Sequence, residues 1–535
     1  MARDLPAELW LEILSYLSAR HVRKLLGINR FLTELALDEI YYSFTLSNGF
    51  RRVVSDIQRI TGPMYAQRIR RLDIYSCFLA NSPEADGGLI TRDHSRLLLE
   101  APRPKPSKST LSALRKWLGS LMISSRTPSS SRLLGKRQNI ALNPQRVQPN
   151  VLAALNVAFP CWPRVEEISL FLDDFTSMPT FSDFLIDLWS QKGNSIRILN
   201  IDASLGGLFE FLEIFLERLE AFPNLERISM KLMPSHVHVV QEAQIDMGKR
   251  LAAFVEWHKH SLHTLIISEP ILDGWVDVAS LTQGLGCLPK LKRIELPVPM
   301  ERASQSRLEY LERFLNLHAH TLECLLMEYR HSSLFNSSSR YAYYNLLHYV
   351  LPKLRLLQLS ELEMDVYVDF EPPPIPFRLP PFRLFAPNLK KLTLKGSSGY
   401  LTDSELTSLL ENMSTGAPLL HSFHFKLEVL RPELLDQLAS QLPKLKSLGI
   451  TYMDISVDAD HTFESPRTAF CETFDREYTN WSLKYLRLAK WSICGKGHPD
   501  RRLSASVAKS IPGLEVNDNS RSCNCILYND VLFSN

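Results

Sequence analysis

The feature that most constrains the fold is a short apolar pattern, Leu-x-x-Leu-x-Leu with other apolar residues allowed in place of leucine. It first occurs at Ile69-Leu72-Ile74, and eleven further occurrences, among them Leu354-Leu357-Leu359, lie between residues 165 and 488. From residue 165 onward their starts are 31, 29, 37, 29, 31, 32, 35, 31, 25 and 38 residues apart. A period of this length is typical of a repeat protein, in which each unit covers the apolar face of its neighbour.

A helical pattern precedes nearly every one of these predicted strands. Apolar residues at steps of three and four occupy, for example, residues 209–219, 247–258 and 433–442. A proline then stands where a helix cannot continue, as in Phe222-Pro223 and Leu442-Pro443. Helix, proline turn and strand therefore recur as one unit.

This unit resembles that of leucine-rich-repeat proteins. The resemblance implies an α/β fold with a solenoid over residues 151–516, in which parallel strands line a concave face and helices lie on the convex face. The family usually carries Asn or Cys in the turn after the strand, where this chain has residues such as Met453 and Trp491. We therefore expect an irregular solenoid.

Alternation along each predicted strand sends the residues between the leucines to the open face. These residues mix both charges with small polar groups, which suits selective protein recognition better than binding of a polyanion. For each single position, a merely solvated surface is an equal alternative. The predicted substrate-binding residues are Glu167, Ser169, Asn200, Asp202, Arg227, Glu295, Gln358, Lys391, His424 and Arg487.

The N-terminus carries a second strong feature, a short helical pattern over residues 5–17 that is apolar around about half of its circumference. Pro6 is pre-set for a first helical turn, and a clearly polar side is made only by Glu8, Glu12 and Ser15. The next forty residues are too few to bury this face. We expect another protein chain to cover it.

This segment resembles the F-box, the three-helix module by which a substrate receptor docks on the Skp-type adaptor of a cullin-RING ubiquitin ligase. The likeness is carried by Leu5-Pro6-x-Glu8-Leu9, by Ile13-Leu14-x-Tyr16-Leu17 and by the residues from Val22 to Phe31. His21 departs from the family, which often has an acidic residue there. The alternative is an ordinary helical cap on the repeats. The resemblance implies adaptor contacts by Leu5, Pro6, Leu9, Trp10, Ile13, Leu14, Leu17, Val22, Leu25 and Ile28.

The predicted organisation is therefore an F-box at 1–46, a first repeat and linker at 47–100, an insertion at 101–150, the solenoid at 151–516, and a cap or tail at 517–535. The insertion has ten basic residues and no Asp or Glu, and its Ser- and Pro-rich ends predict partial disorder. A basic amphipathic helix within it is open to two interpretations, an anionic partner or packing on the solenoid. Residues 361–385, acidic and then proline-rich, are expected to interrupt the array as an insertion that contacts substrate or covers a repeat edge.

Several classes of function are not expected. The chain lacks the common phosphate-binding, dinucleotide-binding, serine-hydrolase and zinc-protease motifs, so neither an enzyme nor a cofactor is predicted. The spacing of Cys494, His498, Cys523 and Cys525 fits no common zinc site. No apolar run is long enough to span a membrane, and a net charge of +3 does not predict a nucleic-acid partner. With no secretion signal, a cytoplasmic or nuclear protein is expected.

Together these features predict a non-catalytic substrate-recognition subunit of a Skp–cullin–F-box (SCF) ubiquitin ligase, a common pattern among fungal receptors. The F-box would bind the adaptor and, through it, a cullin-RING complex, and the repeats would bind an unknown target protein. The alternative is a leucine-rich-repeat scaffold that acts without ubiquitin transfer.

Overall fold

The computed structural model describes residues 9–10, 12–13, 16–28, 30–47, 50–76, 149–172, 179–218, 222–233, 241–268, 277–299, 305–330, 346–365, 382–395, 400–416, 419–456, 466–491 and 497–516. These residues belong to one compact unit made of Met1–Phe78 and Pro149–Asn535. The second unit, Leu79–Gln148, and with it nearly all of the predicted basic insertion, lies outside the described residues. The predicted C-terminal segment 517–535 lies outside them as well.

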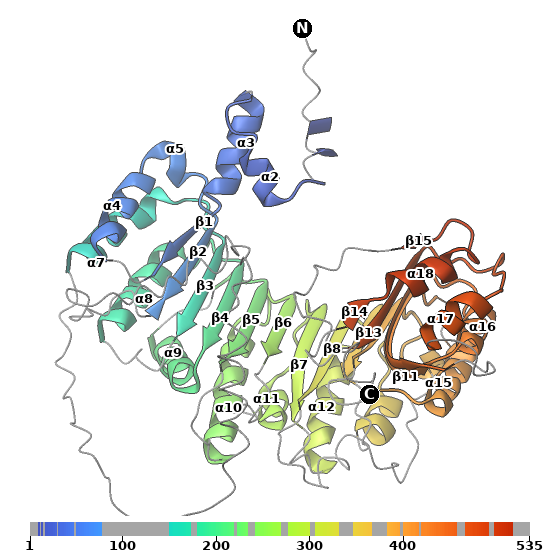
Figure 1. The fold of residues 1–535 in the computed structure, drawn as a ribbon. Coiled ribbons are helices and arrows are strands. Elements are labelled where there is room, and N and C mark those ends of the chain that lie inside the picture. Colours follow the sequence, from blue (N-terminus) through green and yellow to red (C-terminus); the bar gives the residue numbers. More distant parts are fainter. Residues whose placement is uncertain are drawn as a thin grey trace, which may run out of the picture. The chain divides into compact units, whose positions relative to one another are not determined.

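Parallel strands in chain order dominate the fold (Figure 1). The fifteen described strands form one sheet, in which β1 to β14 follow one another in sequence and β15 pairs with β13. All neighbouring pairs from β1 to β13 are parallel, whereas β14 is antiparallel to β13. The strands are β1 (Ser43–Leu46), β2 (Arg71–Tyr75), β3 (Glu167–Leu172), β4 (Ile198–Ala203), β5 (Arg227–Leu232), β6 (Thr264–Ser268), β7 (Arg293–Pro299), β8 (Cys324–Arg330), β9 (Glu361–Asp365), β10 (Lys391–Lys395), β11 (Ser422–Leu430), β12 (Ser447–Ile455), β13 (Tyr485–Trp491), β14 (Gly497–Pro499) and β15 (Glu515–Val516).

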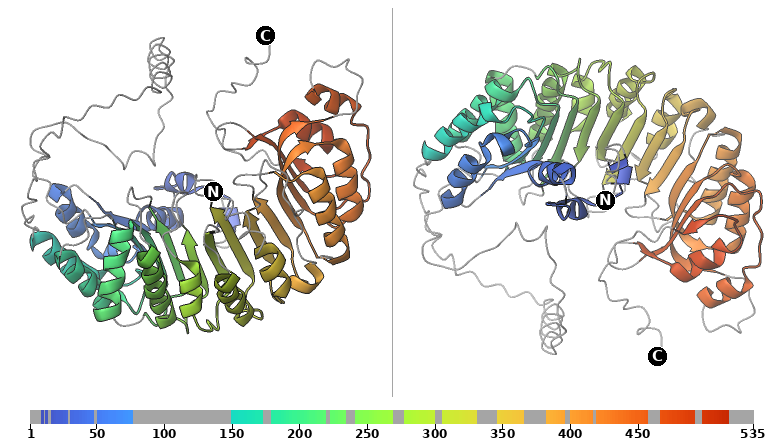
Figure 2. Two further views of the ribbon diagram at one scale, coloured as in Figure 1. Left: turned by 90° about the horizontal axis from the view of Figure 1, so that it is seen from below. Right: turned by 90° about the horizontal axis from the view of Figure 1, so that it is seen from above.

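Helices connect most of the strands and lie along one face of the sheet (Figure 2). A parallel pair needs such a crossover, because the chain must return to the same end of the sheet. The predicted helices at 209–219, 247–258 and 433–442 are present as α9, α10 and α16. The helical elements are α2 (Ala19–Arg23), α3 (Arg30–Ile40), α4 (Phe50–Ile60), α5 (Pro63–Ala66), α7 (Pro149–Ala158), η3 (Phe159–Cys161), α8 (Pro179–Lys192), α9 (Leu205–Arg218), α10 (Gln241–Trp257), α11 (Val278–Gly284), α12 (Gln305–Leu317), η4 (Leu346–Val350), η5 (Leu351–Lys353), α14 (Phe382–Phe385), α15 (Asp403–Gly416), α16 (Pro432–Gln441), α17 (Pro466–Thr473) and α18 (Arg501–Ala508).

Local capping explains where several helices begin. The carboxylate of Asp277 accepts the backbone N–H of Ser280 at 3.1 Å before α11. Before α15, the Thr402 amide donates to Glu405 Oε2 at 2.9 Å, and the Glu405 amide donates to Thr402 Oγ1 at 3.4 Å. This reciprocal pair is a capping box, which fixes the first turn of the helix.

The core follows the register of the strands. The second residue of each strand from β2 to β13 forms one row across the sheet, and every member is at most 1% exposed. This row confirms the predicted repeat, because apolar side chains recur in register on the helical face. Its members are Leu72, Ile168, Leu199, Ile228, Leu265, Ile294, Leu325, Leu362, Leu392, Phe423, Leu448 and Leu486.

One predicted strand was wrong in position. The sequence pattern placed a strand at Leu354-Leu357-Leu359, whereas β9 begins at Glu361 and buries Leu362 and Met364. The chain before β9 forms the tight turn η5 and then a further turn at residues 357–358, in which apolar side chains are also buried. Pattern alone could not separate buried turn residues from strand residues.

Three further boundaries differ from expectation. Residues Ser43–Leu46, assigned to the F-box segment, form β1 and pair with β2. The segment 361–385, expected to interrupt the array, begins with β9 and ends with α14, and its proline-rich middle lies outside the described residues. The strands β14 and β15, which the pattern did not predict, border β13 at the C-terminal end of the sheet.

Candidate functional site

Exposed apolar side chains gather before the first strand. Among the described residues, eighteen large apolar side chains are exposed, and eight of them precede β1. We call six of these the N-terminal apolar surface, with exposed fractions in parentheses: Leu9 (45%), Ile13 (43%), Tyr16 (82%), Leu17 (37%), Leu26 (49%) and Ile28 (62%). A soluble chain scatters such side chains singly, so their concentration in one short segment points to a partner.

Four of the predicted adaptor-binding residues, Leu9, Ile13, Leu17 and Ile28, belong to this surface. Trp10, Val22 and Leu25 are half-buried, and Leu5, Pro6 and Leu14 lie outside the described residues. The helices α2 and α3 pack on each other, but of the first predicted helix only residues 9–10 and 12–13 are described. The three-helix F-box therefore stays a prediction. His21, the departure from the family, accepts or donates a hydrogen bond with the Ser18 hydroxyl at 2.8 Å beside the start of α2.

A single arginine ties α3 to the first repeat. Arg68, in the turn between α5 and β2, donates from Nε to the Met64 carbonyl at 2.9 Å and from Nη1 to the Glu34 carbonyl at 3.0 Å. Its guanidinium also forms ion pairs with the carboxylates of Glu34 and Asp38. The rings of Tyr41 and Tyr65 pack nearby, with their centroids 4.6 Å apart. The segment that carries the N-terminal apolar surface is therefore joined to the repeats by specific contacts.

The open face of the sheet consists of the first, third and fifth residues of each strand, which alternate with the buried rows. Nine of the ten predicted substrate-binding residues lie on this face. Ser169 is nevertheless only 2% exposed, because its neighbours cover it. Gln358 is not on the face, since it lies in the turn before β9. Whether these residues bind a target stays a prediction.

A polar network occupies the open face over β2 to β4. Glu167 Oε1 accepts Asn200 Nδ2 at 2.8 Å and lies 3.2 Å from Arg71 Nη1, and Arg71 Nε contacts Asp73 at 2.7 Å. The rings of Tyr75 and Phe171 stack beside it at 4.2 Å. Acidic and basic side chains balance one another in this region, so it presents a polar but nearly neutral surface.

The charge separates further along the face. Over β7 to β9 the open-face positions hold five carboxylates and one cation: Arg293, Glu295, Pro297, Cys324, Leu326, Glu328, Glu361, Glu363 and Asp365. Burial and the charge of Glu328 raise the pKa of Glu295. Over β10 to β13 the corresponding positions hold no carboxylate: Lys391, Thr393, Lys395, Ser422, His424, Lys426, Ser447, Gly449, Thr451, Tyr485, Arg487 and Ala489. Ion pairs between β9 and β10, Glu361 with Lys391 and Glu363 with Lys395, mark the border.

A glycine lies at the centre of the carboxylate-free region. A Cβ atom at Gly449 would collide with Nδ1 of His424, so the imidazole of β11 occupies the space above β12. Burial lowers the pKa of His424, and the charges of Lys391 and Arg487 lower it further. His424 is therefore a neutral hydrogen-bonding group between two cations at neutral pH.

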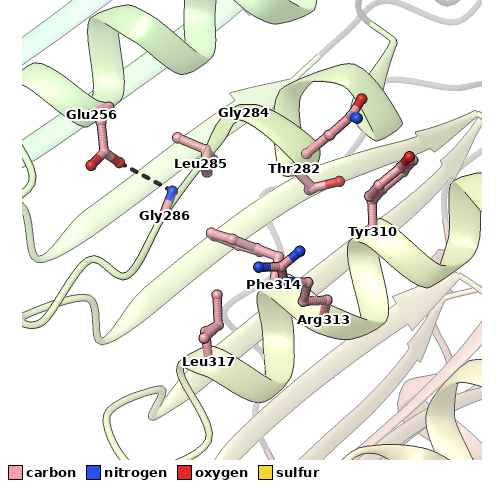
Figure 3. A pocket seen from close by; sticks show the side chains of 10 residues that line it. Glu256, Thr282, Gly284, Leu285, Gly286, Tyr310, Arg313, Phe314 and Leu317 are labelled. Atoms are coloured by element: carbon pink, nitrogen blue, oxygen red, sulfur yellow. Dashed lines mark hydrogen bonds between the residues drawn. The ribbon is translucent and has the colours of Figure 1, made fainter.

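The helical face contains a pocket of about 340 Å³ (Figure 3). It forms because α11 is short and ends between the longer helices α10 and α12. Leu285, Phe314 and Leu317 provide its apolar lining, and Tyr310 and Arg313 reach it from α12. The Glu256 carboxylate is already engaged there, since it accepts the Gly286 amide at 3.1 Å and Lys259 at 2.9 Å.

Two further properties limit the chemistry of the described part of the chain. It contains no group of three or more His, Cys, Asp or Glu side chains that could hold a metal ion. None of its helices combines the length and apolar character needed to cross a membrane. Of the four residues considered above for zinc, only His498 is described.

Sequence reasoning missed several residues of the open face. Lys395, Lys426 and Tyr485 follow from the alternation rule once the strand bounds are known. Glu363 and Asp365 were placed in an insertion because the preceding strand was positioned five to seven residues too early. Applying the pattern at Leu359-Leu362-Met364 would have found them.

No family model matches the sequence, and no curated protein matches it. Among solved structures, the chain is similar to a chain in the crystal structure of the Rad7 and Elc1 complex in yeast. The two share 13% identity with a TM-score of 0.30, over 58% of this chain and 76% of that chain. A likeness at this level carries no argument about function. The strands and helices themselves define an α/β repeat protein with a long, mostly parallel sheet.

Proposed function

We propose that this chain is the substrate-recognition subunit of an SCF-type ubiquitin ligase. The N-terminal apolar surface would bind a Skp-type adaptor, and the open face of the sheet would bind a target protein. The observation that carries the proposal is the gathering of exposed apolar side chains in the segment that resembles an F-box. Burial of such side chains against a partner is the main driving force of stable association.

The repeats support the second half of the proposal. They present a long row of varied polar side chains on rigid strands, which suits recognition of a protein surface. In this proposal the chain makes and breaks no bond. It holds the target close to the ubiquitin-charged enzyme that the other subunits recruit, so that proximity raises the rate of transfer.

The proposal is tested by titrating the full chain with purified Skp-type adaptor. The triple variant Leu9→Ala, Ile13→Ala, Ile28→Ala should bind roughly a hundredfold more weakly, since each truncation removes about 1 kcal/mol of apolar burial. A matched control, Met64→Ala with Val157→Ala, removes exposed apolar side chains elsewhere and should leave binding unchanged. Absence of adaptor binding by the folded parent chain would refute the proposal.

Addition of a cullin-RING complex separates the proposal from the scaffold alternative. A ligase receptor should enter a complex with adaptor and cullin and should itself support ubiquitin transfer to bound protein. Adaptor binding without cullin would instead indicate a repeat scaffold that uses its F-box-like segment for assembly.

A further inference from the structure

The residue immediately before each strand forms a separate row along one edge of the sheet, which we call the edge row. Its backbone carbonyl accepts two amides from the start of the next strand. The Arg70 carbonyl, for example, accepts Glu166 at 2.9 Å and Glu167 at 3.0 Å, and the Lys446 carbonyl accepts Lys484 at 2.8 Å and Tyr485 at 3.0 Å. The members are Arg70, Glu166, Arg197, Glu226, His263, Lys292, Glu323, Ser360, Lys390, His421, Lys446 and Lys484.

Charges along most of the edge row neutralise one another. Glu166 lies 3.7 Å from Arg70 and 3.8 Å from Arg197, and Arg197 lies 2.7 Å from Glu226. Lys292 and Glu323 form a further pair at 2.9 Å. These pairs alternate in sign from one repeat to the next.

The last four positions break this alternation. Lys390, His421, Lys446 and Lys484, which we call the basic edge, contain no acidic residue. The three lysines are exposed, and within the described part of the chain none of them forms an ion pair. Partial burial, together with the charges of Lys446, Lys390 and Lys444, lowers the pKa of His421. Four repeats therefore present unneutralised positive charge on a rigid backbone.

The adjoining open face has matching chemistry. Ser422 and Ser447 follow the basic edge in β11 and β12, and Tyr485 follows it in β13 with 45% of its surface exposed. Arg487, two residues further along β13, is exposed and forms no ion pair among the described residues. Hydroxyl and guanidinium donors beside lysines are the groups that recognise carboxylates and phosphates.

We propose that the basic edge, together with Arg487, docks an acidic segment of a partner polypeptide, one that carries glutamate, aspartate or phosphorylated side chains. Lys390 and Lys484 are three strands apart, which is roughly 14 Å, the length of four to five residues of extended chain. A long polyanion fits less well, because Glu323 and the carboxylates of β7 to β9 adjoin the basic edge. The segment would belong to the target, so the proposal deepens the function proposed above.

The test uses the full chain without adaptor, so that it does not depend on the ligase proposal. Binding is measured by fluorescence anisotropy with labelled peptides of about eight residues, enough to cross the basic edge. One peptide carries glutamates, a second carries glutamines at the same positions, and a third carries phosphoserines. A single-stranded oligonucleotide of similar length is the fourth probe.

The glutamate or phosphoserine peptide should bind, the glutamine peptide should not, and added salt should weaken binding. The double variant Lys446→Gln, Lys484→Gln should weaken it about tenfold or more, because two charged donors are lost. Lys292→Gln removes an equivalent but neutralised lysine of the edge row and is the matched control. The proposal is overturned if no acidic peptide binds, if the control weakens binding equally, or if the oligonucleotide binds more tightly than both acidic peptides.

Discussion

Arg68 is expected to hold α3 against the repeats, and its removal gives a sharp test of how the N-terminal segment is positioned. The side chain is only 12% exposed and uses three nitrogen atoms. Nε and Nη1 donate to the carbonyls of Met64 and Glu34, and the guanidinium pairs with the carboxylates of Glu34 and Asp38. The change Arg68→Ala deletes all of these contacts at once.

The magnitude follows from what is left behind. Glu34 and Asp38 are 51% and 53% exposed, so water replaces the lost ion pairs and each contributes about 0.5 kcal/mol. The two carbonyls lose a charged donor in a nearly buried site, at about 1 kcal/mol each. The sum is about 3 kcal/mol, which should appear as local opening of α3, since Leu32 and Ala36 still pack on the repeats' side of the segment.

Hydrogen exchange measured by mass spectrometry reports this local opening. Amides of α3 should exchange roughly a hundredfold faster in Arg68→Ala, while amides of β5 to β12 keep their protection. Arg59→Ala is the matched control, because Arg59 is 66% exposed and its one ion pair, with Asp56 at 3.3 Å, lies within α4. Unchanged exchange of α3, or a uniform increase over the whole chain, would show that Arg68 does not act as a local anchor.

Three further changes test the packing of the repeats. His318 accepts the Leu288 amide at 2.9 Å through Nε2, whereas Nε2 of His258 has no partner, so urea denaturation at neutral pH should show that His318→Phe costs about 1–3 kcal/mol more than His258→Phe; equal costs would contradict this. Burial lowers the pKa of His258 to about 4, so as the pH falls below 6.5 the unfolded chain takes up the proton first, and stability should decrease by up to about 3 kcal/mol down to pH 4. The variant His258→Phe should flatten that part of the profile, and an unchanged slope would refute the assignment. Asp500→Ala leaves the buried Tyr452 hydroxyl without its acceptor at 2.7 Å and removes the cap of α18, so thermal denaturation should show a loss of about 3–5 kcal/mol, and a loss below about 1 kcal/mol would contradict it.

The strand and helix period could be predicted from the sequence because it depends on local burial. A residue such as Leu265 or Phe423 is apolar wherever its strand lies, and the preceding helix adds its own pattern. The position of β9 could not be predicted in the same way. Leu354, Leu356 and Leu359 are buried in turns and imitate the strand pattern, and only pairing with β8 and β10 selects Leu362.

The edge row was hidden for a different reason. Its members are defined by hydrogen bonds between repeats, and the spacing between successive members varies with the length of each crossover. Glu323 and Lys390, for example, lie on the same row although the sequence around them shares no motif. Only the register of the sheet brings the charges of different repeats side by side.

The contrast along the edge row also bears on why the basic edge exists. Exposed ion pairs such as Lys292 with Glu323 contribute only about 0–1 kcal/mol each to stability, so the fold does not require them. Lysines placed one strand apart, by contrast, repel one another across roughly 5 Å wherever no acid intervenes. Stability alone would favour an acidic residue at Lys446 or His421, as the row has at Glu166 and Glu226. An acidic partner that supplies the missing charge from outside gives a physical reason for retaining the repulsion.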